Sequence, residues 1–528
     1  MTDDEIQKAR AYIDEANNRF GGAYENALKA VRRGELLSGG VWAQIAADMA
    51  FHRHPGFFFS AELESLLIEV AQMLPMASKQ PCHVPSTHSG VSKPRILHVM
   101  TNAFGTGGHT RLVERLVVNT SEQYEHLLVT TAQRGPLPDR LRGIFCSGCS
   151  KWTDLAASGA DLIGRSLRLR QISREAADIV FLHAHPYDVV PLLAFGIPDG
   201  PPVIVLNHAD HLFWLGVSVA DAVADIRLAG QNLTLTRRNT NVSEILPIPL
   251  VERESSVDRL AARKRLGIDD DAVVLLTIAS HLKYSPLGEY NFLDTVTALL
   301  KRSKQAVLVA CGPQHAGAWK EASDSVGGRI KAYGVQTNIS DFHSVADIYL
   351  DSFPYASLTS LLETALHAVP VIGLANTAAP IFSDGSTVEG DAWTHATSLE
   401  EYVDRVGALI ADPELRRVQG SKIREQVAAR HLLPGWQHSF SKLMEVLPSS
   451  HSICIKAKQP QSVDANDLFL ASMGKLTSGR HSINTSLRKH GGCFPVKDRF
   501  TLLVKGILGI DGIRVLPVST YAGKEFFS

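Results

Sequence analysis

The chain has 528 residues, 45% of them hydrophobic, and its 53 Lys and Arg nearly balance its 54 Asp and Glu, which leaves a net charge of −1. This length is too great for one ordinary core, so two or three domains are expected, and the charge balance argues against a general binder of nucleic acid or anionic membranes. No apolar run approaches the roughly 20 residues that span a bilayer, and the acidic start MTDDEIQKAR is unlike a secretory signal, which indicates a cytoplasmic protein without a transmembrane segment.

Residues 1–74 have the apolar periodicity of helices, as in AELESLLIEVAQML, with Gly21-Gly22 and Gly39-Gly40 as expected breaks. This periodicity predicts a small helical domain. Because no residue in it suggests chemistry, we expect it to serve in packing or in docking a partner. Residues 75–94 are rich in Pro and Ser and predict a linker.

Strands and helices then alternate twice along the chain. Strand candidates in residues 95–250 are RILHVM, EHLLVTT, DIVFLHA and PVIVLNHA, and those in residues 251–447 are AVVLLTIAS, AVLVACGP, RIKAYGV, ADIYLDSF and VPVIGL. Such alternation predicts parallel sheets with right-handed crossovers, whose ligands bind beyond the carboxyl ends of the strands. The predicted fold class is therefore α/β, with two Rossmann-like parallel-sheet domains that face a cleft. One long helical stretch is expected from LEEYVDRV to QVAAR.

The C-terminal extension, residues 448–528, has a different composition. From residue 449 onward it holds eleven Lys and Arg against five Asp and Glu, an excess of six positive charges. We expect an irregular or partly disordered module, with a surface that binds an acceptor or a partner as the alternative.

Six cysteines are too few and too scattered for a disulfide framework. Cys146 and Cys149 form a CxxC pair, but no second pair follows at zinc spacing. Two ordinary thiols are therefore favoured over a redox or metal site.

The segment from Ala346 to Leu374, ADIYLDSFPYASLTSLLETALHAVPVIGL, has the chemistry of a nucleotide-sugar site. Thr359 and Ser360 stand at a predicted helix start, where hydroxyls and free amides suit a diphosphate because the first N–H groups and the helix dipole favour anions. Glu363, one turn further on, can accept hydrogen bonds from a ribose diol.

Three more residues of the second domain are candidates for binding the donor. Lys283 follows AVVLLTIAS and could neutralise a pyrophosphate leaving group, with a solvated surface lysine as the alternative. Gly312, in ACGP, permits close approach of the backbone to a ligand or forms a plain turn. The backbone near Gly334 and Val335 could meet the flat edge of a base.

Over residues 95–447, and most clearly over 275–374, these elements resemble the GT-B glycosyltransferases. The phrase LDSFPYASLTSLLETALHAVPVI is similar to the donor-site segment of the O-GlcNAc transferase family and its bacterial cytoplasmic relatives. The resemblance implies that Thr359 and Ser360 hold the diphosphate, that Glu363 holds the ribose and that Lys283 assists the leaving UDP. It also implies a UDP-sugar as substrate, and neither a bound metal nor a separate cofactor.

The same stretch also resembles the Glu-x7-Glu segment of the retaining family-four glycosyltransferases. Their second glutamate would be Glu363, whereas the first, which touches the donor sugar, would fall on Tyr355. This departure favours the O-GlcNAc-transferase-like side of the resemblance, and with it inversion of configuration.

The loop FGTGGHTR, residues 104–111, follows the first strand of the first domain. It is neither a Walker P-loop nor a dinucleotide-binding GxGxxG, because it lacks the Gly-Lys-Ser/Thr ending and spaces its glycines differently. It is similar to the glycine-rich acceptor-side loop of GT-B enzymes, in which Gly108 would approach the donor phosphates. A tight strand-to-helix turn capped by His109 is the alternative.

Two further polar segments, HAHPYD (183–188) and NHADHLFWLG (207–216), follow successive strands and bring more histidines to the same rim. Histidine suits a general base because its pKa lies near working pH. The candidates for catalysis are His109, His185, Asp210 and His211, with Asp210 acting as the base or orienting one. A metal bound by His208, Asp210 and His211 is the alternative.

Four other residues near this rim are expected to be structural. Phe213 and Trp214 could stack on a sugar, but a place in the core is favoured. Asp221 and Asp225 lie one turn apart on the predicted helix VADAVADIR and are expected to form a solvated face with Arg227.

The leading hypothesis is a glycosyltransferase of the hexosyl or N-acetylhexosaminyl type, which moves a sugar from a nucleotide sugar to a protein, lipid or glycan. Two alternatives stay open. A non-hydrolysing UDP-sugar epimerase shares the two-domain fold, and a non-catalytic sugar-nucleotide or protein-binding module would use the N-terminal helices or the basic extension for docking.

Overall fold

The computed structural model describes residues 2–76, 93–105, 108–146, 151–252, 257–375, 395–456, 462–477 and 481–507. It divides into two compact units, which we name by their sheets. The seven-strand unit comprises Asp3–Ile226, Gly230–Leu246 and the described residues from Ser439 onward, and the five-strand unit comprises Pro247–His438 with Arg227–Ala229. The N-terminal helices and the C-terminal extension, predicted as separate segments, both fall in the seven-strand unit.

The sheet of the seven-strand unit is parallel, in the order β3-β2-β1-β4-β5-β6-β7. The four predicted strands are present as β1, β2, β4 and β5, and the short strands β3, β6 and β7 were not anticipated. Their bounds are β1 (Arg95–Met100), β2 (Glu125–Thr130), β3 (Trp152–Asp154), β4 (Ile179–His183), β5 (Val203–Asn207), β6 (Ala222–Asp225) and β7 (Ser243–Ile245).

Helices accompany this sheet along the chain. They are α4 (Gly108–Thr120), α5 (Asp139–Phe145), α6 (Leu162–Ala176), α7 (Val189–Phe195), α8 (Leu228–Thr236) and α16 (Gly435–Glu445), with a 3-10 turn at η1 (Val217–Val219). Side chains cap several starts: Asp161 accepts from the N–H of Gly164 at 2.8 Å, and Asp188 accepts from that of Val190 at 3.0 Å. One core cluster joins the strands to α6 and α7, and Phe213 and Trp214 are buried in it, as predicted.

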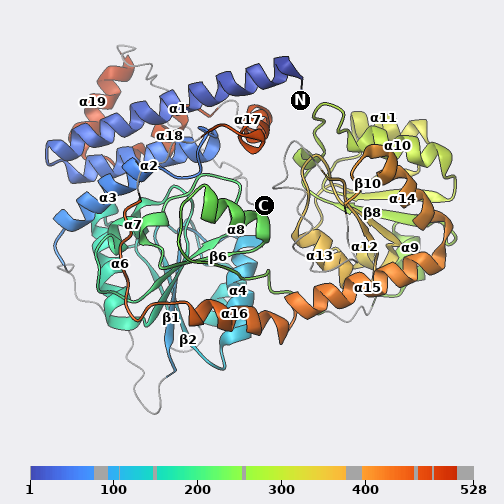
Figure 1. Cartoon of the computed structure of the whole chain (residues 1–528), viewed down its shortest axis with the longest axis horizontal. Helices are drawn as coiled ribbons and strands as arrows, with labels where there is room; N and C mark the ends of the chain where they lie inside the picture. The colour runs from blue at the N-terminus through green and yellow to red at the C-terminus, as the bar shows by residue number, and fades with distance from the viewer. Residues whose placement is uncertain are drawn as a thin grey trace. The chain divides into compact units, whose positions relative to one another are not determined.

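The ends of the described chain lie together in the seven-strand unit. The N-terminal helices α1 (Asp3–Arg32), α2 (Leu36–His52) and α3 (Ala61–Met73) neighbour the C-terminal helices α17 (Ala465–Thr477), α18 (Ile483–His490) and α19 (Val496–Ile507) (Figure 1). The expectation that glycine pairs break the first helices was wrong. Gly21-Gly22 lie inside α1, and Gly39-Gly40 lie inside α2. Glycine at position 39 allows α2 to pack closely against α1, because a Cβ there would stand 2.5 Å from Val31 Cγ2.

The five-strand unit has a parallel sheet in the order β10-β9-β8-β11-β12. Each predicted strand is present: β8 (Val273–Ile278), β9 (Ala306–Cys311), β10 (Ile330–Ala332), β11 (Ile348–Leu350) and β12 (Val371–Ile372). The helices are α9 (Arg259–Arg265), α10 (Phe292–Arg302), α11 (Ala318–Ser325), α12 (Ser340–Val345), α13 (Thr359–Ala365), α14 (Leu399–Ala411) and α15 (Pro413–His431), with a 3-10 turn at η2 (His281–Tyr284).

Three other expectations are corrected by the structure. The long helical stretch is two helices, because Asp412 caps α15 and Pro413 follows at its first position. The basic extension is helical over much of its described part. Asp221 and Asp225 are buried, and Ala222–Asp225 is a strand; Asp221 accepts from the N–H of Val203 at 2.8 Å, so the predicted solvated helical face was wrong. No helix among the described residues is long and apolar enough to cross a membrane.

Candidate functional site

Each sheet has one place where the strand order reverses, and several candidate residues follow the strands on either side of it. In the seven-strand sheet the reversal lies between β1 and β4, which lead to the glycine-rich loop and to His185. In the five-strand sheet it lies between β8 and β11, which lead to Lys283 and Asp351. Crevices at such switch points are where parallel α/β sheets bind ligands.

Asp188 ties the strand ends of the seven-strand unit together. Its Oδ2 accepts hydrogen bonds from the hydroxyls of Thr101, at 2.6 Å, and of Thr131. Thr101 Oγ1 in turn accepts from the backbone N–H of His185 at 2.8 Å. The ends of β1, β2 and β4 are thereby fixed around one buried carboxylate. Sequence reasoning missed Asp188, although its position after HAHPY at a helix start was a signal for it.

Three buried histidines form a hydrogen-bonded chain across the sheet. Thr120 donates its hydroxyl proton to the carbonyl of Leu116 at 2.7 Å, so it must accept from His126 Nε2, 3.2 Å away. His126 Nδ1 is then the acceptor for His98 Nε2–H at 3.0 Å, and His98 Nδ1 accepts from His183 Nε2–H at 3.0 Å. The direction of the chain therefore fixes the tautomer of each neutral ring and leaves His183 Nδ1 with a lone pair.

Desolvation by burial keeps the rings of His98, His126 and His183 neutral. Burial lowers the pKa of His126 to about 4 and that of His183 to about 3, and holds the pKa of His98 well below its usual range. His183 Nδ1 is buried and has no hydrogen-bond partner among the described residues. We call this series of three rings, ending at His183, the histidine relay.

His109, a predicted catalytic residue, lies beside the end of the histidine relay. It occupies the first turn of α4, with its ring centroid 6.3 Å from that of His183 and 4.3 Å from that of His208. Its ring hydrogen-bonds to the backbone of His183, and burial followed by the neighbouring histidines holds its pKa well below the usual range. His109 is thus a neutral, buried ring whose Nε2 has no partner among the described residues.

His185 lies under the glycine-rich loop. Its ring stacks on Phe104 at 5.8 Å and 3°, and its Nδ1 lies 2.9 Å from the hydroxyl of Tyr187. Burial lowers its pKa to about 3, and the charge of Lys489 adds to the effect. A group of this kind is a neutral hydrogen-bonding ring at pH 7 rather than a strong base.

Asp210 and His211 form a pair. His211 Nδ1 lies 3.0 Å from Asp210 Oδ1, and the carboxylate is buried whereas the imidazole side chain is 29% exposed. Among the four predicted catalytic residues, this arrangement comes nearest to that of a general base, because a buried carboxylate orients an accessible imidazole.

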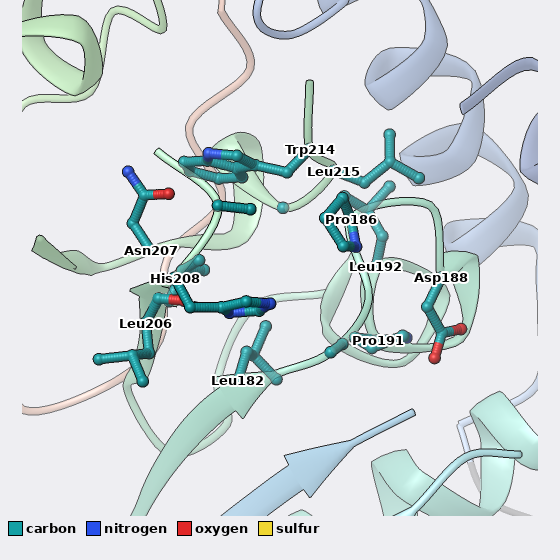
Figure 2. Close-up of a pocket in the computed structure, with 14 residues that line it drawn as sticks. Leu182, Pro186, Asp188, Pro191, Leu192, Leu206, Asn207, His208, Trp214 and Leu215 are labelled. Atoms are coloured by element: carbon teal, nitrogen blue, oxygen red, sulfur yellow. The ribbon is translucent and has the colours of Figure 1, made fainter. Parts of the chain in front are cut away.

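A small cavity of about 30 Å³ lies beside the ends of β4 and β5 (Figure 2). His208, Leu182, Asn207 and Trp214 are among its lining residues. It has room for one water molecule and is far too small for a sugar. Burial lowers the pKa of His208 to about 4, so this ring too is neutral.

In the five-strand unit, Lys283 reaches the segment that carries the predicted donor-binding hydroxyls. The lysine lies in η2, and its Nζ donates to the carbonyl of Ala356 at 2.8 Å, three residues before α13 begins at Thr359. Burial lowers the pKa of Lys283, opposed by the charge of Asp351. It is therefore not the solvated surface lysine of the alternative interpretation.

Asp351, a buried carboxyl whose charge acts on Lys283, was missed by sequence reasoning. Its Oδ1 accepts from the N–H of Ser352 at 2.9 Å and from both the N–H and the hydroxyl of Ser357, at 2.9 and 2.6 Å. Burial raises its pKa to about 6 even so. The carboxyl shapes the loop between β11 and α13 that presents Ala356 to Lys283.

The predicted donor residues of α13 share one half-buried face. Thr359, Ser360 and Glu363 are all partly accessible, and Glu363 lies close enough to His367 to raise the pKa of that ring against the larger effect of burial. Tyr355, by contrast, is buried, and burial raises its pKa to about 12.

The remaining predicted donor residues are glycines and a valine. Gly312 has a φ of +118°, and a Cβ there would stand 1.8 Å from the carbonyl oxygen of Ala279, so packing against the end of β8 already requires glycine. Val335 is 80% exposed beside Gly334. Gly108 begins α4, and nothing lies within 4 Å of a Cβ built on it. Gly107, like Cys149 of the CxxC pair, lies outside the described residues.

Metal-ligand spacing occurs elsewhere than in the alternative interpretation of His208, Asp210 and His211. Within the described ranges, the group whose ligand atoms lie within 4.8 Å of one another is Asp48, His52 and His481, and not His208, Asp210 and His211. Lys489 Nζ stands 3.1 Å from Asp48, so an ammonium already supplies the positive charge that a metal would bring. We therefore interpret this group as a hydrogen-bonded ion cluster.

Comparisons with known proteins support the architecture. No protein-family model matches the sequence, and no curated protein matches it. A glycosyltransferase from Rickettsia africae is similar in structure, with a TM-score of 0.50 and 11% identity over 67% of this chain and 99% of that chain. HepE of Anabaena, solved with UDP and glucose, has a TM-score of 0.50 and 13% identity over the same shares. A mutant O-GlcNAc transferase from Thermobaculum terrenum covers 83% of each chain at 15% identity, with a TM-score of 0.47.

At these identities the similarity concerns the fold, and it does not single out the O-GlcNAc transferase family. The parallel seven-strand and five-strand sheets and these matches agree with the fold class expected from the sequence. The chain therefore has the GT-B fold, built from two Rossmann-like parallel-sheet domains with a helical N-terminus.

Proposed function

We propose that this protein is a metal-independent glycosyltransferase that moves a hexosyl or N-acetylhexosaminyl group from a UDP-sugar to a protein or glycan. The observation that carries the proposal is the hydrogen bond from Lys283 to Ala356, because it joins a half-buried ammonium to the loop leading into Thr359 and Ser360. An ammonium bound to the loop that leads into two hydroxyls suits the diphosphate of a nucleotide sugar. That solved structures of similar fold include a complex with UDP and glucose is consistent with this donor.

In the proposed reaction the acceptor oxygen or nitrogen attacks the anomeric carbon while the bond from that carbon to the phosphate oxygen breaks. His211, oriented by Asp210, takes the acceptor proton. Lys283 neutralises the negative charge that forms on the departing UDP. Glu363 binds the ribose, and the exposed Val335 and the backbone of Gly108 and Gly312 are further donor contacts in this proposal.

The direct test is a panel of UDP- and GDP-sugars, scored for released nucleotide with and without a whole-cell extract as the source of acceptor. Release that depends on the extract supports the transferase. A new sugar nucleotide without release would indicate an epimerase, and binding of UDP without any turnover would indicate a binding module.

The ribose assignment has its own test. Glu363→Ala should weaken UDP binding at least about tenfold in calorimetry, because a hydrogen bond to a charged group contributes about 1.5–3 kcal/mol. Glu425→Ala, an exposed carboxylate in the same unit, is the matched control. Equal UDP affinity of the two variants would refute the role of Glu363.

A further inference from the structure

Helix α19, the last helix that the structure describes, presents a row of apolar side chains to solvent. The row consists of Val496, Phe500, Leu503 and Val504, whose spacing places them on one face of the helix. Their exposed fractions lie between 37% and 78%. Single exposed apolar residues are ordinary on a protein surface, whereas a contiguous apolar face is typical of a docking surface. We call these four residues the apolar stripe.

The opposite face of α19 fixes the helix to the seven-strand unit. Leu502 packs against the core cluster of this unit, and Asp498 accepts a hydrogen bond from the hydroxyl of Ser38 in α2. Just before the helix, Phe494 is buried, and its ring centroid lies 5.4 Å from that of Trp42. Figure 1 shows α19 at the margin of the unit, on the side of the N-terminal helices. The apolar stripe therefore belongs to a helix that is already formed and anchored.

Each edge of the apolar stripe carries a cation. Because an α-helix has about 3.6 residues per turn, Lys497 lies next to Val504 at one edge, and Arg499 lies next to Leu503 at the other. The Lys497 side chain is 82% exposed, and its Nζ lies 3.7 Å from Oε1 of Glu35, an accessible ion pair of the kind that contributes little. Arg499 is exposed as well. Positive charge thus borders the stripe on both sides.

We propose that α19 docks on the surface of a bilayer that contains anionic phospholipids. The apolar stripe enters the boundary between headgroups and acyl chains, and Lys497 and Arg499 bind lipid phosphates. An apolar helical face with basic residues at its edges is the pattern of helices that lie in this boundary, because long basic side chains reach back to the headgroups. This inference does not depend on the proposed glycosyl transfer.

Charge complementarity favours a lipid surface over a protein partner. A protein would need a groove with acidic groups on both rims, whereas an anionic bilayer offers the apolar and the negative groups together. From residue 449 onward the extension holds eleven Lys and Arg against five Asp and Glu, and this excess of six positive charges adds to the attraction. The whole chain has a net charge of only −1, so the attraction is local to the extension.

Co-sedimentation of the full chain with vesicles tests the docking without any nucleotide sugar. We expect binding to vesicles of equal parts phosphatidylcholine and phosphatidylserine. Phe500→Ser combined with Leu503→Ser should lower the affinity at least about tenfold, the effect of withdrawing buried apolar side chains. Leu260→Ser combined with Val418→Ser, at exposed helix positions of the five-strand unit, is the matched control and should bind as wild type. Because all four side chains are exposed, each variant should keep the wild-type Tm. Failure of the wild type to bind, or equal binding by the two double variants, would overturn the proposal.

The role of the charges has a separate test. Lys497→Gln and Arg499→Gln should each weaken binding to the phosphatidylserine vesicles about fivefold, and vesicles of phosphatidylcholine alone should bind the wild type at least about tenfold more weakly. Lys301→Gln and Lys442→Gln remove exposed cations elsewhere and should have no effect. Equal binding to the two kinds of vesicle would overturn the assignment to anionic lipid. Light scattering that showed a wild-type dimer and a monomeric Phe500→Ser, Leu503→Ser variant would assign the stripe to a second copy of this chain and overturn the proposal.

Discussion

The seven-strand unit surrounds its switch point with neutral imidazoles, whereas the five-strand unit places an ammonium beside a buried carboxyl. Burial causes both patterns but acts on the two groups in opposite directions. It lowers the pKa of His183 and His185 to about 3 and raises that of Asp351 to about 6. The seven-strand unit therefore offers uncharged hydrogen-bonding groups at its switch point, and the five-strand unit offers charged ones. In the proposed reaction the seven-strand unit would supply the base, His211, and the five-strand unit the cation that binds the leaving group, Lys283.

The largest effect should come from the proposed base, His211, of the seven-strand unit. His211→Gln should lower turnover by about 10²–10⁴-fold, the usual contribution of a general base, and leave UDP affinity unchanged. His438→Gln, at an exposed histidine, is the control for steady-state kinetics. Turnover equal to that of the control would remove His211 from the mechanism.

Lys283→Met tests the proposed role of the five-strand unit in binding the leaving group. It should lower turnover by about 10²–10³-fold, the cost of losing one group that stabilises transition-state charge, and it should also weaken UDP binding. Lys320→Met removes an exposed ammonium of the same unit that pairs with Asp324, and should behave as wild type. If His211→Gln weakened UDP binding and Lys283→Met did not, the assignment of roles to the two units would be reversed.

The two units should respond oppositely to acid. The histidines have folded-state pKa values below the unfolded value of about 6.5, so protons favour the unfolded state as pH falls below 6.5, at a cost of up to about 2 kcal/mol per imidazole by pH 5. Asp351 has a folded-state pKa above its unfolded value, so its protonation stabilises the folded state as pH falls through about 6 toward 4. Hydrogen exchange at pH 7 and pH 5 should therefore show lost protection in β1, β2 and β4, and retained protection in β8 and β11. Uniform loss in both sheets would contradict the comparison.

The smallest expected effect concerns the far end of the histidine relay. Thr120→Val keeps the shape of the side chain but leaves His126 Nε2–H without its acceptor, which should cost about 1–3 kcal/mol in the free energy of unfolding. Thr236→Val is closely matched, because Thr236 makes the same bond to the carbonyl four residues earlier, with Asn232, at an exposed site. If urea denaturation showed the same loss of unfolding free energy in Thr120→Val and Thr236→Val, Thr120 would not be an essential acceptor for His126.

Much of the fold could be predicted because its central strands are local features. RILHVM is a short apolar run that follows Pro94, and it is β1 without any shift of boundary. The short strands β3, β6 and β7 were not predicted, because a segment of three or four residues carries too little periodicity. Asp221 and Asp225 even have helical spacing, yet pairing with β5 makes their segment a strand.

The candidate site was predictable only where it is contiguous. Thr359, Ser360 and Glu363 fall within five residues of one helix, so their shared face could be read directly. His98 and His126 are ordinary strand residues until the sheet register brings them together. Lys489 is 441 residues from Asp48, and no local pattern announces that contact.

The discontinuity of the seven-strand unit has a consequence for the order of events during synthesis. Its sheet is complete in the nascent chain at β7, but Lys489 and Ser486, which bind Asp48, emerge only after the whole five-strand unit. At typical elongation rates that interval is roughly 12 to 50 s. During that interval Asp48 of α2 lacks the hydrogen bonds that Ser486 and Lys489 supply in the folded chain, so the seven-strand unit is incomplete until the extension has been synthesised. The last described helices therefore complete the earliest-made unit.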